Sequence, residues 1–401
     1  MKGHSSRRYH ASETGYMRLA LRLARRGYGS TSPNPMVGAV LVKGGRIVGR
    51  GWHRRAGEPH AEVEALRDVE KWGQRVKGAR LYVTLEPCST QGRTPACTDA
   101  IRAAGIQRVV AGAVDPNPRH RGRGFEILQR AGIAVTQGVL GEECARLNEA
   151  FNHWVVHRTP LVTVKAAMTL DGKIATAAGE SKWITGEPAR AYGMKLRQGA
   201  DAILVGINTV LVDDPRLTVR SLKSKVQGPK SAGRGPTIQA EAGQAAGGKQ
   251  GLRRIVLDAK ARTPLEAKVV SDECAALTTV VVNRSAPRAR VAALAQRIKV
   301  LVAPGAGKEI NLRWLLKKLG AEGVTSLLVE GGGEVNASFL LQGLAQRVAF
   351  FYAPMVLGGR DSRPAVAGEG DGTLAESLSL TDLEWRRLGP DWLLRARVAR
   401  R

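Results

Sequence analysis

The sequence predicts an α/β protein built from two successive domains. Short runs of small aliphatic residues alternate with longer amphipathic runs, a pattern typical of a parallel or mixed sheet covered by helices. Hydrophobic residues make up 43% of the 401 residues and aromatic residues only 4%, which suits buried strands rich in Ala, Val and Leu. The chain is long for one ordinary domain. We expect one domain over 1–158 and a second over 159–401, divided at Thr159–Pro160.

The first domain begins with an expected helix over 14–27, whose apolar residues favour one face and which Gly27 ends. Two strands then meet at Gly44–Gly45, a dipeptide typical of hairpin turns. Strands and helices alternate from there to the end of the domain. The expected strands are 37–42, 46–51, 80–85, 107–114 and 133–137, and the later helices are 60–72, 95–104, 122–131 and 141–158.

The second domain repeats this alternation. Its expected strands begin at Leu161 and continue at 202–206, 254–258, 278–283, 300–302, 326–330 and 347–353, with helices such as 187–198 and 312–319 between them. Residues 221–251 are rich in Gly, Ala, Ser, Lys and Gln and contain almost no apolar run. Such a segment buries too little surface to offset its ordering entropy, so we expect a flexible insertion there.

The formal net charge of +27 favours anionic partners. The charge is spread along the chain, and the sequence lacks a leucine zipper, an RNA-binding signature and a paired-cysteine zinc finger. Phosphate-bearing substrates and cofactors are therefore at least as well supported as nucleic acid as partners. No run approaches the ~18 apolar residues of a membrane span. The N-terminal segment lacks the apolar core of a secretory signal, and four cysteines are too few for a disulfide framework. We expect a cytoplasmic protein without a membrane partner.

One histidine and two cysteines in the first domain form a candidate metal site. His60 opens an expected helix, Cys88 follows a strand and the turn Glu86–Pro87, and Cys97 comes after eight further residues. Because proline suits the first turn of a helix, we expect Cys88 there, with its thiolate stabilised by free backbone N–H groups. One imidazole and two thiolates suit Zn²⁺ and leave a fourth position open for water, as in catalytic sites.

Glu62 lies two residues after His60 and is the candidate proton carrier. A carboxylate beside zinc-activated water can take its proton and deliver protons to the substrate and the leaving amine. The order HxE then PC then C is the pattern of zinc deaminases, which hydrolyse an amidine-like carbon. Alternatively, His60 is a surface or capping residue and the cysteines are a disulfide or buried thiols. A disulfide suits the expected compartment poorly, and buried thiols do not explain the HAE and EPC contexts together.

A resemblance to a known family covers nearly the whole chain. In the first domain it rests on SPNPMVGAV, RAGEPHAEVEAL, VTLEPCSTQGRTPAC and DPNPRHRGRG, and in the second on VKAAMTLDGKIA, GESKWITG, GINTVLVDDPRLTVR, LDAKARTP, VEGGGEVNASFL and YAPMVLGG. These segments resemble the bifunctional deaminase–reductases of riboflavin biosynthesis. The resemblance implies a cytidine-deaminase-like three-layer domain followed by a dihydrofolate-reductase-like domain. It also implies Zn²⁺ and NADPH as cofactors, a phosphorylated pyrimidine as substrate, and a homo-oligomer.

The resemblance further implies two reactions. The first removes the 2-amino group of a diaminopyrimidinone ribosylamino 5′-phosphate, and the second reduces the ribosyl side chain to ribityl. The implied zinc ligands are His60, Cys88 and Cys97, with Glu62 as proton donor and acceptor. The implied substrate contacts are Asn34, His53, Arg93, Ser181, Arg197, Leu217, Arg220 and Glu330. The implied NADPH contacts are Lys165, Ala167, Trp183, Thr209, Asp213, Gly332, Gly333, Glu334, Val335, Asn336, Ala337 and Ser338.

The residues alone say less about the second domain. The glycine turn in VEGGGEVNAS could cradle a phosphate on backbone N–H groups, or be only a tight strand–helix turn, and it is not the GxGxxG fingerprint. Thr90 and Ala259 also depart from the family pattern, in which histidine and serine are common. One alternative is therefore a deaminase whose reductase-like domain is inactive. Another is a nucleic-acid deaminase with an appended domain, which the eight-residue cysteine spacing argues against.

Overall fold

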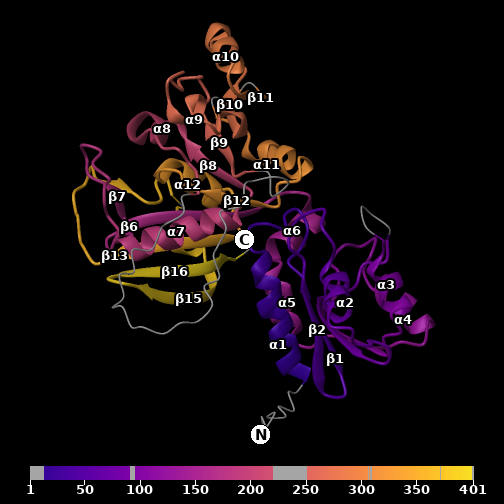
Figure 1. Ribbon diagram of the computed structural model, residues 1–401. Helices are drawn as coiled ribbons and strands as arrows, with labels where there is room; N and C mark the ends of the chain where they lie inside the picture. The colour runs from indigo at the N-terminus through magenta and orange to yellow at the C-terminus, as the bar shows by residue number, and fades with distance from the viewer. Residues whose placement is uncertain are drawn as a thin grey trace, which may run out of the picture.

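The computed structural model describes residues 13–90, 95–219, 251–305, 307, 309–370 and 372–399. These residues form a five-stranded sheet, a nine-stranded sheet and a two-stranded ribbon, with helices packed against the two larger sheets (Figure 1). The predicted α/β class is confirmed. Within the described part of the chain, no helix combines the length and apolar character needed to cross a membrane.

The five-stranded sheet has the order β2-β1-β3-β4-β5. Its strands are β1 (Gly38–Lys43), β2 (Arg46–Trp52), β3 (Arg80–Leu85), β4 (Arg108–Ala113) and β5 (Ala134–Thr136). β1 pairs antiparallel with β2 and β3, whereas β3, β4 and β5 run parallel. The predicted hairpin turn is present, and Gly44 and Gly45 both adopt positive φ, which glycine tolerates without strain.

Helices cover both faces of this sheet and complete three layers (Figure 1). One face packs against α1 (Glu13–Ala24) and α5 (Gly141–Leu147), and the other against α2 (Ala61–Lys71), α3 (Cys97–Ala103) and α4 (Arg123–Arg130). A 3₁₀ turn, Arg25–Gly27, extends α1. Alternate residues of β1 divide between the two cores: Leu41 packs against α2 and Val40 against α1. The period-2 pattern of the strands therefore positions both helix layers.

The single helix predicted over 141–158 is wrong. The structure has two helices, α5 and α6 (Glu149–His157), with a break at Asn148. The buried Asn148 side chain accepts a hydrogen bond from Met36 N at 2.8 Å and donates to Met36 O at 2.9 Å. Because Met36 lies far away in the sequence, helix-forming patterns within 141–158 could not show this break.

The nine-stranded sheet has the order β11-β10-β9-β8-β12-β6-β13-β16-β15. Its strands are β6 (Leu161–Thr169), β8 (Ala202–Gly206), β9 (Arg253–Leu257), β10 (Thr278–Asn283), β11 (Lys299–Ala303), β12 (Ser326–Val329), β13 (Arg347–Ala353), β15 (Leu380–Leu388) and β16 (Asp391–Val398). The predicted strands end at Ala353, so the hairpin β15–β16 is an addition. β15 carries charged residues and is mostly exposed, and it therefore lacks the apolar alternation that reveals a half-buried strand.

Two helix layers enclose this second sheet. α7 (Glu187–Gly199), α8 (Ile207–Asp213), α9 (Lys268–Ser271) and α10 (Arg288–Ala295) pack on one face, and α11 (Leu312–Ala321) and α12 (Gly333–Leu341) on the other. The ribbon pairs β7 (Lys173–Ala175) with β14 (Arg363–Pro364), and two further 3₁₀ turns cover Ala275–Leu277 and Leu374–Glu376. The expected flexibility of residues 221–251 concerns a segment that, apart from Gly251, lies outside the described residues.

The two halves of the chain are joined by polar contacts as well as by the connection at Thr159. Trp154 Nε1 on α6 donates to Gly320 O on α11 at 2.8 Å. Glu149, also on α6, forms ion pairs with Arg347 and Arg397 on β13 and β16. Figure 1 shows α6 at this junction, between the two sheets.

Candidate active sites

His60, Cys88 and Cys97 converge at one end of the first sheet. His60 Nδ1 lies 3.3 Å from Cys97 Sγ and 3.4 Å from Cys88 Sγ, and all three donor atoms lie within 4.8 Å of one another. Tetrahedral Zn²⁺ with Zn–N near 2.0 Å and Zn–S near 2.3 Å places neighbouring donor atoms about 3.5 Å apart. The predicted ligands are thus brought together, and their chemistry and spacing fit zinc.

The expected position of Cys88 in the first turn of a helix is wrong. Residues 86–89 are not helical, and α3 begins only at Cys97. Cys88 nevertheless receives a backbone hydrogen bond, because Cys97 N at the start of α3 donates to its Sγ at 3.3 Å. A hydrogen bond with the Cys97 side chain lowers the pKa of Cys88 and raises that of Cys97.

Glu62 lies in the first turn of α2 with only 3% of its surface exposed. Burial, followed by the charge of Cys88, raises its pKa to about 7. A carboxyl group with such a pKa can both take and give a proton near neutral pH. A cation bound by the three neighbouring ligands would lower this pKa again.

Asn34 and His53 form a hydrogen-bonded pair beside this cluster. His53 Nδ1 lies 3.1 Å from Pro59 O, so this nitrogen carries the proton and Nε2 is left to accept from Asn34 Nδ2 at 3.2 Å. Burial lowers the pKa of His53, which favours the neutral ring that this arrangement requires. The His53 and His60 rings pack edge to face at 5.3 Å, so the pair adjoins the candidate zinc site.

Glu86 is a residue of this site whose role the sequence analysis did not identify. Its buried carboxylate accepts from Asp115 N and Gly122 N at 3.0 Å and from Gly124 N at 2.9 Å. It therefore ties the loop after β4 to the segment that carries Cys88. The indication of this role that the sequence offered was the position of Glu86 within TLEPC, two residues before Cys88. Arg93, a predicted substrate contact, lies outside the described residues, as does Arg220 in the second half.

In the second half, Lys165, Arg197 and Glu330 meet in one pocket. Arg197 Nε and Nη2 each lie 2.9 Å from a carboxylate oxygen of Glu330, and Lys165 Nζ lies 3.6 Å from Glu330 Oε2. The pocket has a volume of about 300 Å³, and Ala167, Ser181 and Trp183 also line it. We call it the Arg197 pocket. Because two cations face one carboxylate, these three groups give the pocket a net positive charge, which suits a phosphorylated ligand.

Trp183 stands at the rim of the Arg197 pocket with 71% of its surface exposed. The Arg190 guanidinium lies 4.7 Å from the centre of its ring, a cation–π arrangement. Thr209 and Asp213 lie one turn apart on α8, and Lys182 Nζ is 3.9 Å from an Asp213 carboxylate oxygen. Neither Thr209 nor Asp213 is among the residues that line the Arg197 pocket.

The glycine turn between β12 and α12 has little room for side chains. A Cβ on Gly331 would lie 2.4 Å from Val335 Cβ, and one on Gly333 would lie 2.4 Å from Pro364 O, whereas Gly332 faces open space. Glu334, Val335 and Ser338 line a second cavity of about 520 Å³, together with Ala259. The open backbone at the start of α12 fits a dinucleotide phosphate.

Three predicted contact residues have side chains directed into the protein. Leu217 is 3% exposed and packs in the core with α8 and α9. Asn336 is fully buried, with its Nδ2 donating to Ala365 O at 2.8 Å, and Ala337 is 3% exposed. Leu217 adopts positive φ. Because the side chains of these three residues are buried, a ligand could contact them only through their backbone atoms.

Comparison with known families gives two matches that together span most of the chain. Residues 11–113 match the cytidine and deoxycytidylate deaminase zinc-binding region, and residues 160–394 match the RibD C-terminal domain. The riboflavin biosynthesis protein RibD of Aquifex aeolicus is 42% identical over 382 residues, which cover 95% of this chain and 97% of that protein. RibD of Escherichia coli is 40% identical over 94% of this chain and 96% of its own length.

Solved structures agree with these matches. RibD of Acinetobacter baumannii superposes with a TM-score of 0.81 at 33% identity, covering 97% of this chain and 99% of its own. The diaminohydroxyphosphoribosylaminopyrimidine deaminase/5-amino-6-(5-phosphoribosylamino)uracil reductase of Thermotoga maritima gives a TM-score of 0.77 at 32% identity, covering 98% and 100%. The predicted fold, a cytidine-deaminase-like half followed by a dihydrofolate-reductase-like half, is confirmed.

Proposed function

Because this chain belongs to the RibD family of riboflavin biosynthesis proteins, we propose that its two side-chain clusters each carry one reaction of a bifunctional enzyme. The protein is a zinc-dependent pyrimidine deaminase and an NADPH-dependent reductase of riboflavin biosynthesis. The deaminase hydrolyses the 2-amino group of 2,5-diamino-6-ribosylamino-4(3H)-pyrimidinone 5′-phosphate. The reductase converts the ribosyl chain to ribityl and gives 5-amino-6-ribitylamino-uracil 5′-phosphate.

The observation that carries the deaminase assignment is the convergence of three ligand atoms beside a buried carboxyl group. His60, Cys88 and Cys97 would hold Zn²⁺, and Glu62 lies two residues from the first of them. When bound, Zn²⁺ supplies the Lewis acidity that makes hydroxide available near neutral pH.

In this proposal, Glu62 transfers the protons of the deamination. It accepts one proton from water and delivers it to the pyrimidine ring. It then takes the proton of the newly added hydroxyl group and passes it to the amine as the C–N bond breaks, so that water is consumed, a carbonyl forms and ammonia is released. Its burial in the first turn of α2, two residues from His60, supports this role, because burial favours the neutral form in which a carboxyl group carries a proton. Asn34 would orient the pyrimidine, with His53 fixing the direction of its amide. Arg93 is proposed as a substrate contact from the family resemblance alone.

For the reduction, we assign binding of the phosphorylated substrate to the Arg197 pocket. Arg197, Glu330, Ser181 and the backbone at Leu217 would contact the substrate, and Arg220 is a further contact proposed from the resemblance. The NADPH-binding residues would be Lys165, Ala167, Trp183, Thr209, Asp213 and the turn 332–338. When bound, NADPH supplies the hydride. The open space at Gly332 supports the turn as its phosphate site.

The alternative of an inactive reductase-like domain is not favoured. The family match covers residues 160–394, and the charged groups of Lys165, Arg197 and Glu330 lie in contact. A domain kept only for structure would have no need of a bidentate ion pair open to a pocket, since a buried pair is a poor source of stability.

Two further properties are proposals. We place the protein in the cytoplasm, because a reducing compartment keeps Cys88 and Cys97 available as zinc ligands. We also propose a homo-oligomer, as the family resemblance implies, which light scattering of the purified protein tests. A single monomeric mass over a tenfold range of concentration would contradict it.

The experiment that tests the two-site assignment separates the reactions by substrate. The purified protein is incubated with the diaminopyrimidinone phosphate, with and without NADPH, and the products are identified by mass spectrometry. We expect the deaminated ribosyl product alone without NADPH and the ribityl product with it. The Glu62→Gln variant should not deaminate the diaminopyrimidinone phosphate, but it should still catalyse the NADPH-dependent reduction when the deaminated substrate is supplied. The Arg197→Gln variant should deaminate the substrate but not catalyse the reduction. A variant that loses both activities equally, while remaining folded, would contradict the assignment.

A further inference from the structure

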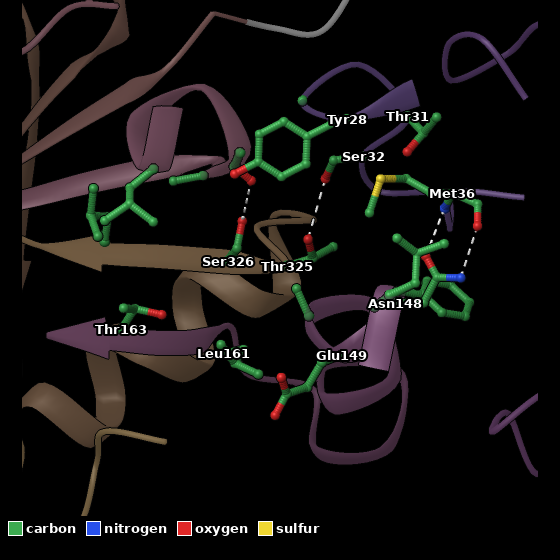
Figure 2. Close-up of a pocket in the computed structure, with 18 of the residues that line it drawn as sticks. Tyr28, Thr31, Ser32, Met36, Asn148, Glu149, Leu161, Thr163, Thr325 and Ser326 are labelled. Atoms are coloured by element: carbon green, nitrogen blue, oxygen red, sulfur yellow. Dashed lines mark hydrogen bonds between the residues drawn. The ribbon is translucent and has the colours of Figure 1, made fainter. Parts of the chain in front are cut away.

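The loop that carries Asn34 is fastened to the second half of the chain. Ser32 Oγ, two residues before Asn34, donates to Asp201 Oδ2 at 2.7 Å and lies 3.3 Å from Thr325 Oγ1. Asp201 directly precedes β8, and Thr325 directly precedes β12. Ser32 and Thr325 both line a cavity of about 610 Å³ to which the two halves contribute residues. Figure 2 shows their side chains facing each other.

Asp201 is itself held firmly. Its Oδ2 also accepts from Thr325 N at 2.8 Å and from Thr325 Oγ1 at 2.7 Å, and its backbone N donates to Ser326 Oγ at 3.0 Å. Asp201 is 9% exposed and Thr325 4%. Hydrogen bonds to a buried ionised acceptor are short and stronger than those between neutral groups. Ser32 is therefore bound to a rigid point of the second sheet.

The loop has other attachments on both sides of Asn34. Tyr28 Oη donates to Lys195 O on α7 at 3.1 Å, and Met36 exchanges two hydrogen bonds with Asn148 (Figure 2). Residues 28 and 32 are thus fixed to the second half and residue 36 to the first. Asn34 lies between the attachments at Ser32 and Met36, so its position depends on both halves.

We propose that Asp201, in the reductase half, is a positioning residue for the deaminase reaction. By holding Ser32, it fixes the loop so that Asn34 stays against His53 and keeps its amide oriented for the pyrimidine. The proposal rests on the role assigned to Asn34 above. A displacement of about 1 Å in a substrate-positioning group can reduce a rate on the order of 100-fold, so this attachment is large enough to matter.

The test uses Ser32→Ala in the full-length protein, because this change removes the contact without unpairing Asp201 from Thr325. We expect kcat/KM of deamination to fall about 10-fold or more, mainly through KM. Zinc content and the reduction of supplied deaminated substrate should be unchanged. Ser32→Thr, which retains the hydroxyl, should restore most of the activity.

A double-mutant cycle distinguishes positioning from a general structural role. If Ser32 acts through Asn34, then Ser32→Ala should reduce activity much less in an Asn34→Ala background than in the wild type. The matched control is Trp154→Phe, which removes another hydrogen bond between the halves, from Trp154 Nε1 to Gly320 O, away from this loop. We expect it to lower the melting temperature without changing the deaminase KM.

Three results would overturn the proposal: wild-type kcat/KM in Ser32→Ala, additive effects in the cycle, or an equal loss in Trp154→Phe. A wild-type protein that contains zinc but does not deaminate the substrate would overturn the proposed function itself, and this inference with it.

Discussion

Arg197 and Glu330 form a bidentate ion pair that joins α7 to the end of β12, with both N–O distances at 2.9 Å. The two side chains are only 15% and 10% exposed. Arg197 Nη1 also donates to Thr218 O at 3.2 Å, and Lys165 Nζ lies 3.6 Å from Oε2 of the same carboxylate. The pair therefore fixes a helix, a strand end and the loop after α8 around one pocket.

The ionisation of Glu330 should make folding stability depend on pH. Burial alone would raise its pKa, but Lys165 and Arg197 outweigh burial and lower the pKa from 4.5 to about 2. A carboxyl group with a lowered folded-state pKa contributes its full stability above pH 4.5 and loses it as the pH falls through 2. We expect Glu330→Gln to lower the unfolding free energy at pH 7 by about 3 kcal/mol, because it breaks a buried pair.

This difference between wild type and Glu330→Gln should shrink as the pH is lowered from 4.5 towards 2. Urea unfolding at a series of pH values measures it. Glu126→Gln is a matched control, since Glu126 forms an exposed pair with Arg130 and should change stability little at any pH. A difference for Glu330→Gln that stays constant over this pH range would contradict the assigned ionisation.

Glu62→Gln should remove proton transfer but retain the shape of the deaminase site. We expect deamination to slow by about 10²–10⁴-fold, the usual contribution of a general acid–base group. Zinc content and reductase activity should match the wild type. Glu64→Gln is the control, because Glu64 lies on the same helix but pairs with Arg54 and Arg67 at the surface. Equal losses in the two variants would show that Glu62 has no special role.

The sequence predicted the ligand cluster because its residues lie within two short motifs around one strand. His60 and Glu62 are separated by one residue, and Cys88 and Cys97 follow the next strand. Local spacing therefore carried most of the information. The details that it predicted wrongly depend on distant partners: Cys88 is supported by α3, and Asn148 interrupts a helix to bind Met36.

The second half could not be predicted in the same way. Lys165, Arg197 and Glu330 come from β6, α7 and the end of β12, so only the fold brings them together. The family resemblance named them, whereas periodicity and spacing gave no reason to group them. The resemblance also named Asn336, whose side chain is buried. Side-chain direction at a turn depends on the backbone, which composition does not reveal.

Removal of zinc should affect only the deaminase and should expose a difference between the two ligand thiols. Cys88 is partly exposed and its pKa is lowered by a hydrogen bond with Cys97, whereas Cys97 is buried and its pKa is raised. Because thiolates are the reactive form, we expect iodoacetamide to modify Cys88 before Cys97 in chelator-treated protein near pH 7. Mass spectrometry of peptides measures this order.

Zinc-loaded protein is the control for this labelling, and both ligand thiols should be protected in it. Reductase activity should survive chelation, and deaminase activity should return with added Zn²⁺. Modification of Cys97 first, or no protection by zinc, would contradict the arrangement of the site.

Arg254 is fully buried, and all five of its N–H groups have acceptors. It pairs bidentately with Asp272 at 2.8 Å and donates to Thr278 Oγ1, Val269 O and Arg216 O. Asp272→Ala would leave a buried charge without its counterion, so we expect the unfolding free energy to fall by about 3–5 kcal/mol. Urea unfolding measures this loss. Glu142→Ala, which removes an exposed pair with Arg146, should cost less than about 1 kcal/mol.

The contact between Arg254 and Arg216 O gives this variant a second expected effect. Arg216 directly precedes Leu217, a proposed substrate contact, and the next residue, Thr218, accepts a hydrogen bond from Arg197 through its backbone O. When Asp272 no longer holds the guanidinium, the loop loses a fixed point, so KM for the phosphorylated substrate in the reductase reaction should rise while deamination stays unchanged. A stability loss no greater than that of Glu142→Ala would show that the guanidinium finds water or another partner. An unchanged reductase KM would show that Arg197, through Thr218 O, is sufficient to hold the loop.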